Sequence, residues 1–389
     1  MRIVGLLALT VVIALAGCIG PVALHEAVLL YDESVGRLER ELLLLNIART
    51  HQRLPGHFTV TSSVTATFDY RANLGVFATY VPQLNWLYGA NVNTSVAESP
   101  TMTILPVQGE EFSSRILTPL DERKFQSLLF QGVALDMLVR LMSDGLELYN
   151  PDGALERFVA NWPGRREEYE EFRRRALHLA WLQTHRQLSV EALTFDEAVL
   201  AALPTPLSGG EQLVALERGW RPAGLQVYEL KKPMIGRIVI TNYDPRTLTN
   251  AERLALNTRA AANGRNVILV DVRTGHPGGE FPLSGAIRLR SLNLILAFLA
   301  AGIEEAREID VAPDPHTGAV GQNARRTLGI EVTDNAPGAR VPQVAYRGKY
   351  YSVADTAWDR EAFRLLHQLF QMGAPEAPRP GVPGITISK

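Results

Sequence analysis

The chain begins with one apolar run that is followed directly by its only cysteine, so an export segment is set apart from the part that folds. Arg2 supplies the positive charge, residues 4–15 form the apolar run, and two small residues precede Cys18. A signal peptide has these three parts in this order. The run is shorter than the about 20 residues that a membrane-spanning helix needs. We therefore expect residues 1–17 to be a signal peptide that does not enter the mature fold.

The Leu-Ala-Gly-Cys sequence at residues 15–18 resembles the lipobox of bacterial lipoproteins. The resemblance implies a diacylglyceryl group on the Cys18 thiol, cleavage before Cys18, and acylation of the new amine. Several acyl chains would anchor the protein nearly permanently, because one chain alone binds a membrane only marginally. Ile19 follows the cysteine, whereas retention in the inner membrane of enteric bacteria favours aspartate there. We therefore expect a cell-envelope protein in the outer rather than the inner membrane. The alternative is an N-terminal anchor helix with an incidental cysteine.

The composition is that of an ordinary globular protein. The chain has 389 residues, of which 46% are hydrophobic and 21% charged, enough for one large domain or two smaller ones. With Cys18 acylated, no thiol remains for a disulfide or a metal, so the body must depend on its hydrophobic core. The formal charge is −2 without a concentrated basic region, so we expect no nucleic-acid partner.

Hydrophobic patterning predicts an α+β fold, in which an antiparallel sheet packs with helices to form one large body or two closely docked lobes. We expect residues 18–24 to be a short lipidated tether. An N-terminal α+β portion would cover 25–205 and a C-terminal α/β portion 211–374, with a loop at 203–210 as the seam. The Pro-rich residues 375–389 are expected to form a flexible tail.

The N-terminal portion is predicted to open with a helix over residues 25–53 that Pro55-Gly56 ends. Residues 57–108 are rich in Thr, Val and Phe and partly alternate, which predicts three or four antiparallel strands. Asn73 and Gly75 would mark a turn or bulge, and Pro100 a strand end or edge. Further helices are expected at 110–117, 125–148, 154–160, 166–187, 194–202, 250–263, 291–301 and 358–372. Further strands are expected at 225–228, 235–241 and 267–272, with a hairpin at 345–353.

The sequence contains none of the strong catalytic or cofactor motifs. GxSxG, HExxH, GxxxxGK[ST] and GxGxxG are all missing from it. We therefore expect no cofactor, no metal and no assigned catalytic residue. Catalytic groups can also converge from distant positions, so the lack of a motif leaves an enzyme open.

Five polar residues are weak candidates for a ligand site. Three of them follow the expected strand 267–272, and ligands of α/β proteins often bind after the carboxyl end of a strand. The other two resemble a hard-cation cluster, although prolines break the spacing that a calcium loop needs. The candidates are Asp271, Arg273, His276, Asp310 and His316. The alternative is that these segments are ordinary loops.

Four segments together resemble a group of uncharacterised bacterial lipoproteins of about this length. The group tends to have a Leu-rich helix before a strand, a "PT…P…G" segment before a helix, and a closing hairpin and helix. The matching segments are 42–64, 99–120, 287–304 and 344–370. The resemblance implies no activity and transfers no site residues.

These features favour a lipid-anchored, non-catalytic protein that is a structural or accessory subunit of an outer-membrane assembly. Its partners would be the membrane, through the acyl chains on Cys18, and one or more envelope proteins. The alternative is an envelope hydrolase or a small-ligand-binding lipoprotein whose site is assembled from scattered residues.

Acylation of Cys18 can be measured directly. Mass spectrometry of the membrane fraction should find a mature N-terminal cysteine that carries acyl chains, because the signal peptide is cut immediately before it. A mature protein that begins elsewhere and is soluble without detergent would contradict this prediction.

Overall fold

The computed structural model describes residues 2–81, 85–106, 109–201, 207–224, 227–338 and 341–373. The chain divides into two compact units. Unit 1 takes in Met1–Leu42 and His57–Glu111, and unit 2 takes in Leu43–Gly56 and Phe112–Gly373. Helices and strands both contribute to the fold, so the predicted α+β class is confirmed. The expected tail, 375–389, lies outside the described residues.

Helix α1 (Arg2–His51) begins near the N-terminus and ends just before Pro55-Gly56, as expected. It includes the residues predicted to form the signal peptide and the tether, and it continues through the helix expected from His25. Leu43, Leu44 and Ile47 near its end are fully buried. Among the residues that the structure describes, no helix is both long and apolar enough to cross a membrane.

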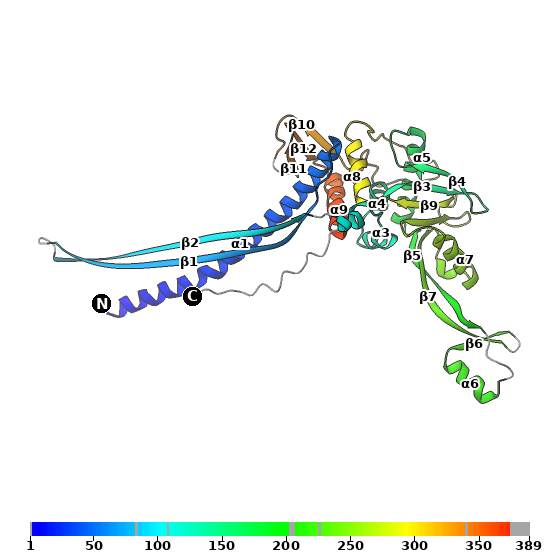
Figure 1. Cartoon of the computed structure of the whole chain (residues 1–389), viewed down its shortest axis with the longest axis horizontal. Coiled ribbons are helices and arrows are strands. Elements are labelled where there is room, and N and C mark those ends of the chain that lie inside the picture. The colour runs from blue at the N-terminus through cyan, green and yellow to red at the C-terminus, as the bar shows by residue number, and fades with distance from the viewer. Residues whose placement is uncertain are drawn as a thin grey trace. The chain divides into compact units, whose positions relative to one another are not determined.

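Residues 57–108 form two long strands and not the three or four that we expected. β1 (Thr59–Val81) and β2 (Asn85–Pro106) pair in antiparallel register along their whole lengths (Figure 1). Asn73 pairs with Asn93 and Pro100 with Ala66, so the predicted turn and strand end both lie inside the ribbon. Asn and Gly favour turns locally, but continuous pairing of β1 with β2 on both sides of them places them inside the ribbon.

Unit 2 is built on a mixed seven-stranded sheet of order β4-β3-β9-β8-β7-β5, with β6 paired to β7. Only β7 and β8 are parallel to each other, and the other neighbours are antiparallel. The strands are β3 (Ser143–Tyr149), β4 (Leu155–Ala160), β5 (Ser189–Ala201), β6 (Trp220–Gly224), β7 (Val227–Thr241), β8 (Val267–Val272) and β9 (Leu283–Leu289). Both of the predicted portions, 25–205 and 211–374, therefore contribute strands to this one sheet.

Ten helical segments lie in or next to this unit. They are α2 (Gly109–Phe112), a π-helix (Ser113–Leu117), α3 (Glu122–Phe130), α4 (Leu135–Met142), α5 (Arg166–Thr184), α6 (Gly209–Glu217), a 3-10 turn (Pro245–Thr247), α7 (Asn250–Ala261), α8 (Leu292–Ala301) and α9 (Ala357–Gly373). Side-chain caps explain where several of them begin. Thr249 and Glu252 form a capping box on α7, and Ser291 accepts a bond from the Leu294 amide at the start of α8.

Three predicted helices are wrong in whole or in part. The one expected over 125–148 ends at Phe130, turns at Gly132 with a positive φ of 89°, and gives way to strand β3 after α4. In the helices expected over 154–160 and 194–202, residues 155–160 belong to strand β4 and residues 194–201 to strand β5. Short apolar runs fit both the helical period of 3.6 residues and the strand period of 2, and pairing with neighbouring strands decided these cases. Gly145 in β3 allows close approach, because a Cβ there would lie 2.4 Å from the Val159 carbonyl oxygen.

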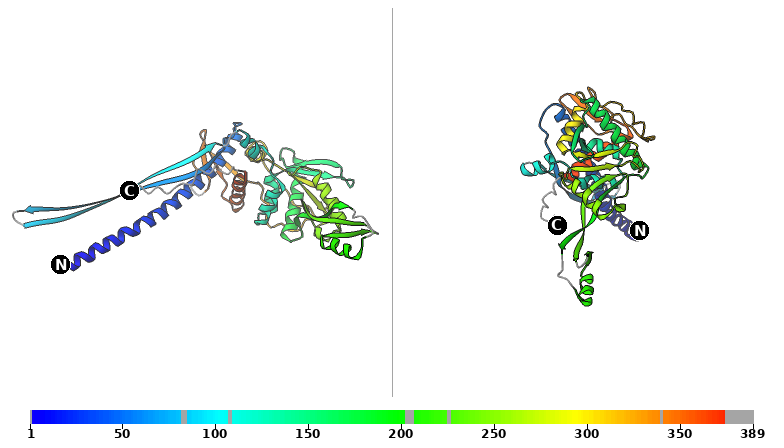
Figure 2. Two further views of the ribbon diagram at one scale, coloured as in Figure 1. Left: turned by 60° about the horizontal axis from the view of Figure 1, so that its bottom comes forward. Right: turned by 90° about the vertical axis from the view of Figure 1, so that its right-hand side faces the viewer.

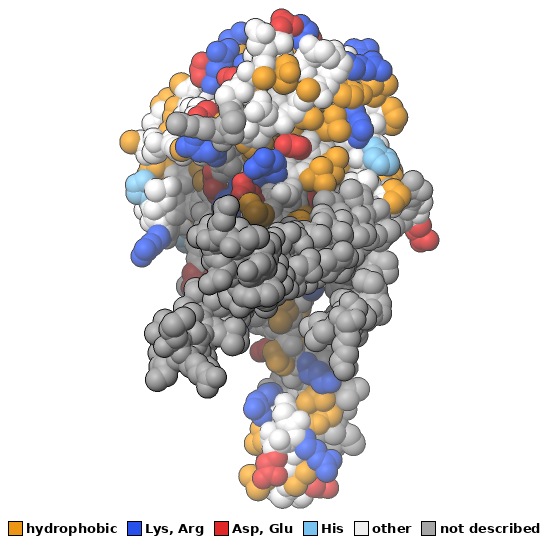
Figure 3. All heavy atoms as spheres, turned by 90° about the vertical axis from the view of Figure 1, so that its left-hand side faces the viewer, with side chains coloured by type: hydrophobic (Ala, Val, Ile, Leu, Met, Phe, Trp, Pro, Cys, Tyr) orange, Lys and Arg blue, Asp and Glu red, His pale blue; other side chains and the backbone are white. Residues whose placement is uncertain are grey.

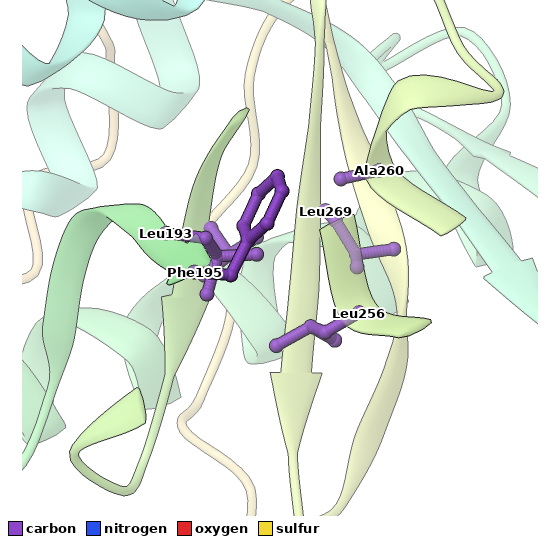
Figure 4. Close-up of a cluster of buried hydrophobic side chains, with 6 residues drawn as sticks. Leu193, Phe195, Leu256, Ala260 and Leu269 are labelled. Carbon is purple, nitrogen blue, oxygen red and sulfur yellow. The ribbon is translucent and has the colours of Figure 1, made fainter. Parts of the chain in front are cut away.

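The core of unit 2 lies on both faces of the central strands. Every residue of β8 is buried, as expected for a strand covered on two sides. One face packs against α7, where Leu256 and Ala260 meet Leu193 and Phe195 from β5 and Leu269 from β8 (Figure 4). The predicted strand 267–272 and helices 250–263 and 291–301 are thereby confirmed.

A ribbon of β5 and β7 continues beyond the rest of the sheet and ends at β6 and α6, as Figure 2 shows. A separate three-stranded sheet has the order β10-β12-β11 and comprises β10 (Ile330–Thr333), β11 (Gln343–Tyr346) and β12 (Lys349–Val353). The predicted hairpin there is confirmed. Arg347 and Gly348 both have positive φ at its turn, the geometry of a two-residue hairpin loop.

The burial of Leu269 should be measurable as stability. Leu269→Ala should lower the free energy of unfolding of unit 2 by about 2–5 kcal/mol, because it leaves a cavity between α7 and the sheet. The control is Leu254→Ala on α7, where Leu254 is 39% exposed. It should change the free energy of unfolding by no more than about 0.5 kcal/mol. Urea denaturation measures both, and equal effects would contradict the described packing.

Candidate functional site

Three of the five candidate residues meet at the carboxyl ends of the parallel strands β7 and β8. Asn242 follows β7 and ties the strand ends together. Its side-chain NH₂ donates to the carbonyl oxygens of Arg273 (2.9 Å) and Pro277 (3.0 Å), and its Oδ1 accepts from the Arg273 amide (2.9 Å). The loop after β8 is therefore held against the end of β7.

Tyr243 is the centre of this cluster, and the sequence did not single it out. Its hydroxyl donates to Asp271 Oδ2 over 2.6 Å, and Arg273 Nε donates to the same oxygen over 2.7 Å. The Arg273 guanidinium lies 4.4 Å above the Tyr243 ring, and the His276 ring centroid lies 5.2 Å from that of Tyr243. The sequence therefore correctly placed Asp271, Arg273 and His276 at one strand edge.

The electrostatics of the cluster limit its chemistry. Burial, followed by the hydrogen bond to Asp271, raises the pKa of Tyr243 well above its ordinary value, so the phenol stays protonated and acts as a donor. Asp271 is buried and is already engaged by two donors. Arg273 is the member that solvent reaches, since its side chain is 41% exposed. This arrangement orients one guanidinium at a surface, and its buried carboxylate serves to hold that group.

The other two candidates lie elsewhere. His316 Nδ1 is 2.8 Å from Asp314 Oδ1 on an exposed loop, and Asp310 is an exposed partner of Arg325 at 3.8 Å. His178 on α5 bonds Thr317 in the His316 loop and the Gly278 carbonyl oxygen in the loop after β8. Burial lowers the pKa of His178, which therefore acts as a neutral structural link. In the described ranges, no three His, Cys, Asp or Glu side chains are grouped closely enough to hold a metal.

A buried network of charges also lies in unit 2, and sequence reasoning missed it. Arg140 on α4 is fully buried and donates to Glu308 Oε1 over 2.9 Å and to the Ala324 carbonyl oxygen over 2.7 Å. Arg173 on α5 donates to Asp136 and, over 2.9 Å, to Asn323. The sequence feature that could have revealed this network is the pair Asp136 and Arg140, two charged residues inside an otherwise apolar run.

Glu308 accepts more bonds than any other carboxylate in this network. Its donors include the Tyr169 hydroxyl (2.8 Å) and the Thr327 hydroxyl (2.6 Å). Burial alone would raise the pKa of Glu308, but attraction from Arg140 and the bonds from Thr327 outweigh it and lower that pKa. The hollow beside Glu308 measures only about 10 Å³, room for at most one water molecule. The network therefore ties residues 308–327 to α4 and α5 and leaves no space for a substrate.

A larger hollow of about 570 Å³ lies between the β3–β4 turn and the end of α7. Glu147, Tyr149, Arg259 and Asn263 are among the residues that line it. The Tyr149 hydroxyl donates to Glu147 over 2.7 Å, and burial with this bond raises the pKa of Tyr149 to about 12. None of the five candidate residues lines this hollow.

The β1–β2 hairpin has a long alternation of apolar and polar residues along its two paired strands. Residues directly opposite each other in an antiparallel pair belong to the same face of the ribbon. From Val64 onwards, the even-numbered register positions of both strands form one face and the odd-numbered positions the other. The even face has apolar residues throughout except Thr94 and Glu98. The odd face is mainly Thr, Ser, Asn and Gly, and also includes the charged residues Asp69 and Arg71 and the apolar residues Phe77, Val81, Leu87 and Ala97.

Comparisons with protein-family models, with curated proteins and with solved structures each found no match to this chain.

Removal of the Glu308 charge should weaken the fold and change its response to acid. Because the folded pKa of Glu308 lies below its ordinary 4.5, its contribution to stability is present above that pH and is lost as the pH falls through the folded value. Glu308→Gln should cost about 3–5 kcal/mol at neutral pH, since Arg140 would lose the nearer of its two buried acidic partners, Glu308 and Asp136. It should also flatten the loss of stability below about pH 4.5.

The matched control is Glu305→Gln, whose carboxylate pairs with Arg53 at the surface. Its effect on stability should stay below about 1 kcal/mol. Urea denaturation at neutral and acid pH measures both variants. A Glu308→Gln protein as stable as the parent would contradict the assigned network.

Proposed function

We propose that this protein is a lipid-anchored subunit of an assembly at the outer membrane, and that it acts through membrane and protein contacts. The observation that carries the proposal is the β1–β2 hairpin. Its strands have 23 and 22 residues, and within the described part of the chain no third strand pairs with either of them. A two-stranded ribbon is at best marginally stable alone in water.

The outer edges of the hairpin support a partner in particular. Each edge presents a row of backbone N–H and C=O groups that a neighbouring strand could bond. Soluble proteins usually keep such edges short or covered, whereas this ribbon extends for about 75 Å at roughly 3.3 Å per residue. A long, uncovered, two-faced ribbon is therefore suited to an assembly and poorly suited to an isolated monomer.

The end of the β5–β7 ribbon offers a second contact surface. Leu213, Val214 and Leu216 on α6 are exposed, and Leu213 is 62% exposed. Figure 3 shows hydrophobic side chains among charged ones at the foot of the view, where α6 lies. A hollow of about 290 Å³ lies beside this helix and is lined by Val214, Ala215 and Trp220. Exposed apolar groups of this kind are typical of protein contacts.

The rival function, a small-ligand binder or hydrolase, is favoured by one observation. The hollow between the β3–β4 turn and α7 has a volume within the range of small-molecule pockets, about 300–1,000 Å³. Its polar lining could orient a ligand. The Tyr149 hydroxyl in this hollow donates to Glu147, so neither group is arranged as an activated nucleophile. Of the two rival functions, small-ligand binding therefore suits the hollow better than hydrolysis.

The assembly can be tested on membranes solubilised in mild detergent. The full-length protein should migrate with a partner or as several copies. A variant in which residues 64–102 are replaced by a short Gly-rich turn should migrate as a monomer, because the uncovered strand edges are gone. It should keep the acylated Cys18 and the unfolding transition of unit 2, which serve as controls.

A full-length protein that is monomeric and has no stable partner would overturn this proposal. A shortened variant that keeps its partner would move the contact to the α6 surface, where Leu213→Lys then provides the next test.

A further inference from the structure

Two tyrosines and a tryptophan bracket the distal half of the β1–β2 hairpin. Tyr70 and Tyr80 are ten residues apart on the even face of β1. In the register, Tyr80 pairs with Trp86, and Tyr88 follows two positions later on β2. A strand that crosses a bilayer needs about 9–11 residues, and aromatic girdles mark both of its interfaces. The spacing of these aromatic residues therefore matches the thickness of a membrane.

Between the tyrosines, the even face has the composition that hydrocarbon requires. On β1 it consists of Ala72, Leu74, Val76 and Ala78. The opposite positions on β2 hold Thr94, Val92, Ala90 and Tyr88. No charged residue belongs to this face between Tyr70 and Tyr80, and Glu98 falls outside the bracket, opposite Phe68. The hairpin thus provides a membrane-length apolar band with charge only beyond its border.

Over the same interval, the odd face is mainly polar. Asn73, Gly75 and Thr79 on β1 stand opposite Asn93, Asn91 and Leu87 on β2, and Phe77 stands opposite Gly89. Arg71 lies at the border and pairs with Ser95. A polar face behind an apolar one would have to meet water or polar groups, because unpaired polar groups in hydrocarbon cost several kcal/mol each. A ribbon buried on both sides in lipid is therefore excluded.

We infer that residues 70–80 and 86–96 cross a lipid bilayer, with the even face toward lipid, as part of a closed ring of the same hairpin from several copies of this chain. The inference rests on the proposed function and names its partners. Closure follows from the backbone, because a single hairpin in hydrocarbon would leave both outer edges unbonded. The β1 edge of one copy can pair with the β2 edge of the next, a head-to-tail contact that rotation closes. The odd faces would then line an aqueous interior.

A cysteine scan tests the two faces separately. Each full-length variant has one introduced thiol, and acylated Cys18 does not react with the label. An environment-sensitive fluorophore is attached at Ala72→Cys, Leu74→Cys or Val76→Cys, with Asn73→Cys and Gly75→Cys as adjacent controls. The proteins are inserted into vesicles of phosphatidylethanolamine and phosphatidylglycerol. Quenchers are lipids with a doxyl group on the acyl chain, or aqueous iodide.

The expected result alternates with residue number. Labels at 72, 74 and 76 should shift to shorter emission wavelength and be quenched by the doxyl lipids. Labels at 73 and 75 should be quenched by iodide from the water-filled interior. Efficient iodide quenching at all five positions, or doxyl quenching only at the odd ones, would overturn the inference.

A functional readout comes from dye-loaded vesicles. The parent protein and Asn73→Asp should release a small entrapped dye, whereas Leu74→Asp should lose release, since it places a charge toward lipid. Equal release by the two variants would count against the assigned faces. If the shortened hairpin variant leaves the assembly while the labels do not alternate, only this inference fails. If no assembly or acylated Cys18 is found, the proposed function fails as well.

Discussion

The need of every backbone N–H and C=O group for a partner governs both units of this protein. In unit 2 the need is met internally, because six strands lie side by side and helices cover the sheet. The central strand β8 has neighbours on both sides and is buried at every position. In the hairpin of unit 1, the described strands β1 and β2 meet this need only along the inner edges where they pair with each other. The uncovered edges connect the fold to the proposed assembly.

A second constraint operates inside unit 2, where residues 302–329 between α8 and β10 have little regular structure. Such a segment cannot satisfy its own polar groups, and charged side chains from α4 and α5 do so instead. Arg140 bonds carbonyl oxygens of the segment, and Glu308 from the segment bonds Tyr169 and Thr327. Buried ion pairs add little net stability but are costly to break, so they serve to specify one arrangement of a loop.

The polar cluster around Tyr243 shows how the ends of two parallel strands bring candidate residues together. The parallel pair β7 and β8 brings Asp271 and Arg273 to the expected edge. Tyr243 and Arg273 both donate to Asp271 Oδ2, so this buried carboxylate holds the phenol and the guanidinium in place. The feature that could recruit a ligand is the half-exposed Arg273 guanidinium. The proposed assembly rests instead on the long β1–β2 hairpin, whose two strands pair along their whole lengths.

Local patterns determined much of this protein from the sequence alone. The apolar run before Cys18, the α+β class, the helices at 250–261 and 357–373 and the hairpin at Arg347-Gly348 follow from periodicity, caps and turn residues within a few positions. The edge that gathers Asp271, Arg273 and His276 also followed, because strand ends carry such loops.

Tertiary structure alone decided the rest, since the deciding partners lie far away in the chain. Residues 143–149 became a strand because β4 and β9 flank them. Tyr243 and Glu308 gained their roles from residues 28 and 168 positions away. Asn73 and Gly75, which locally favour a turn, stay in register because the alternating residues of β1 find a matching β2 on both sides of them. A turn signal acts over four residues, whereas the pairing of two strands sums its contacts over their whole length.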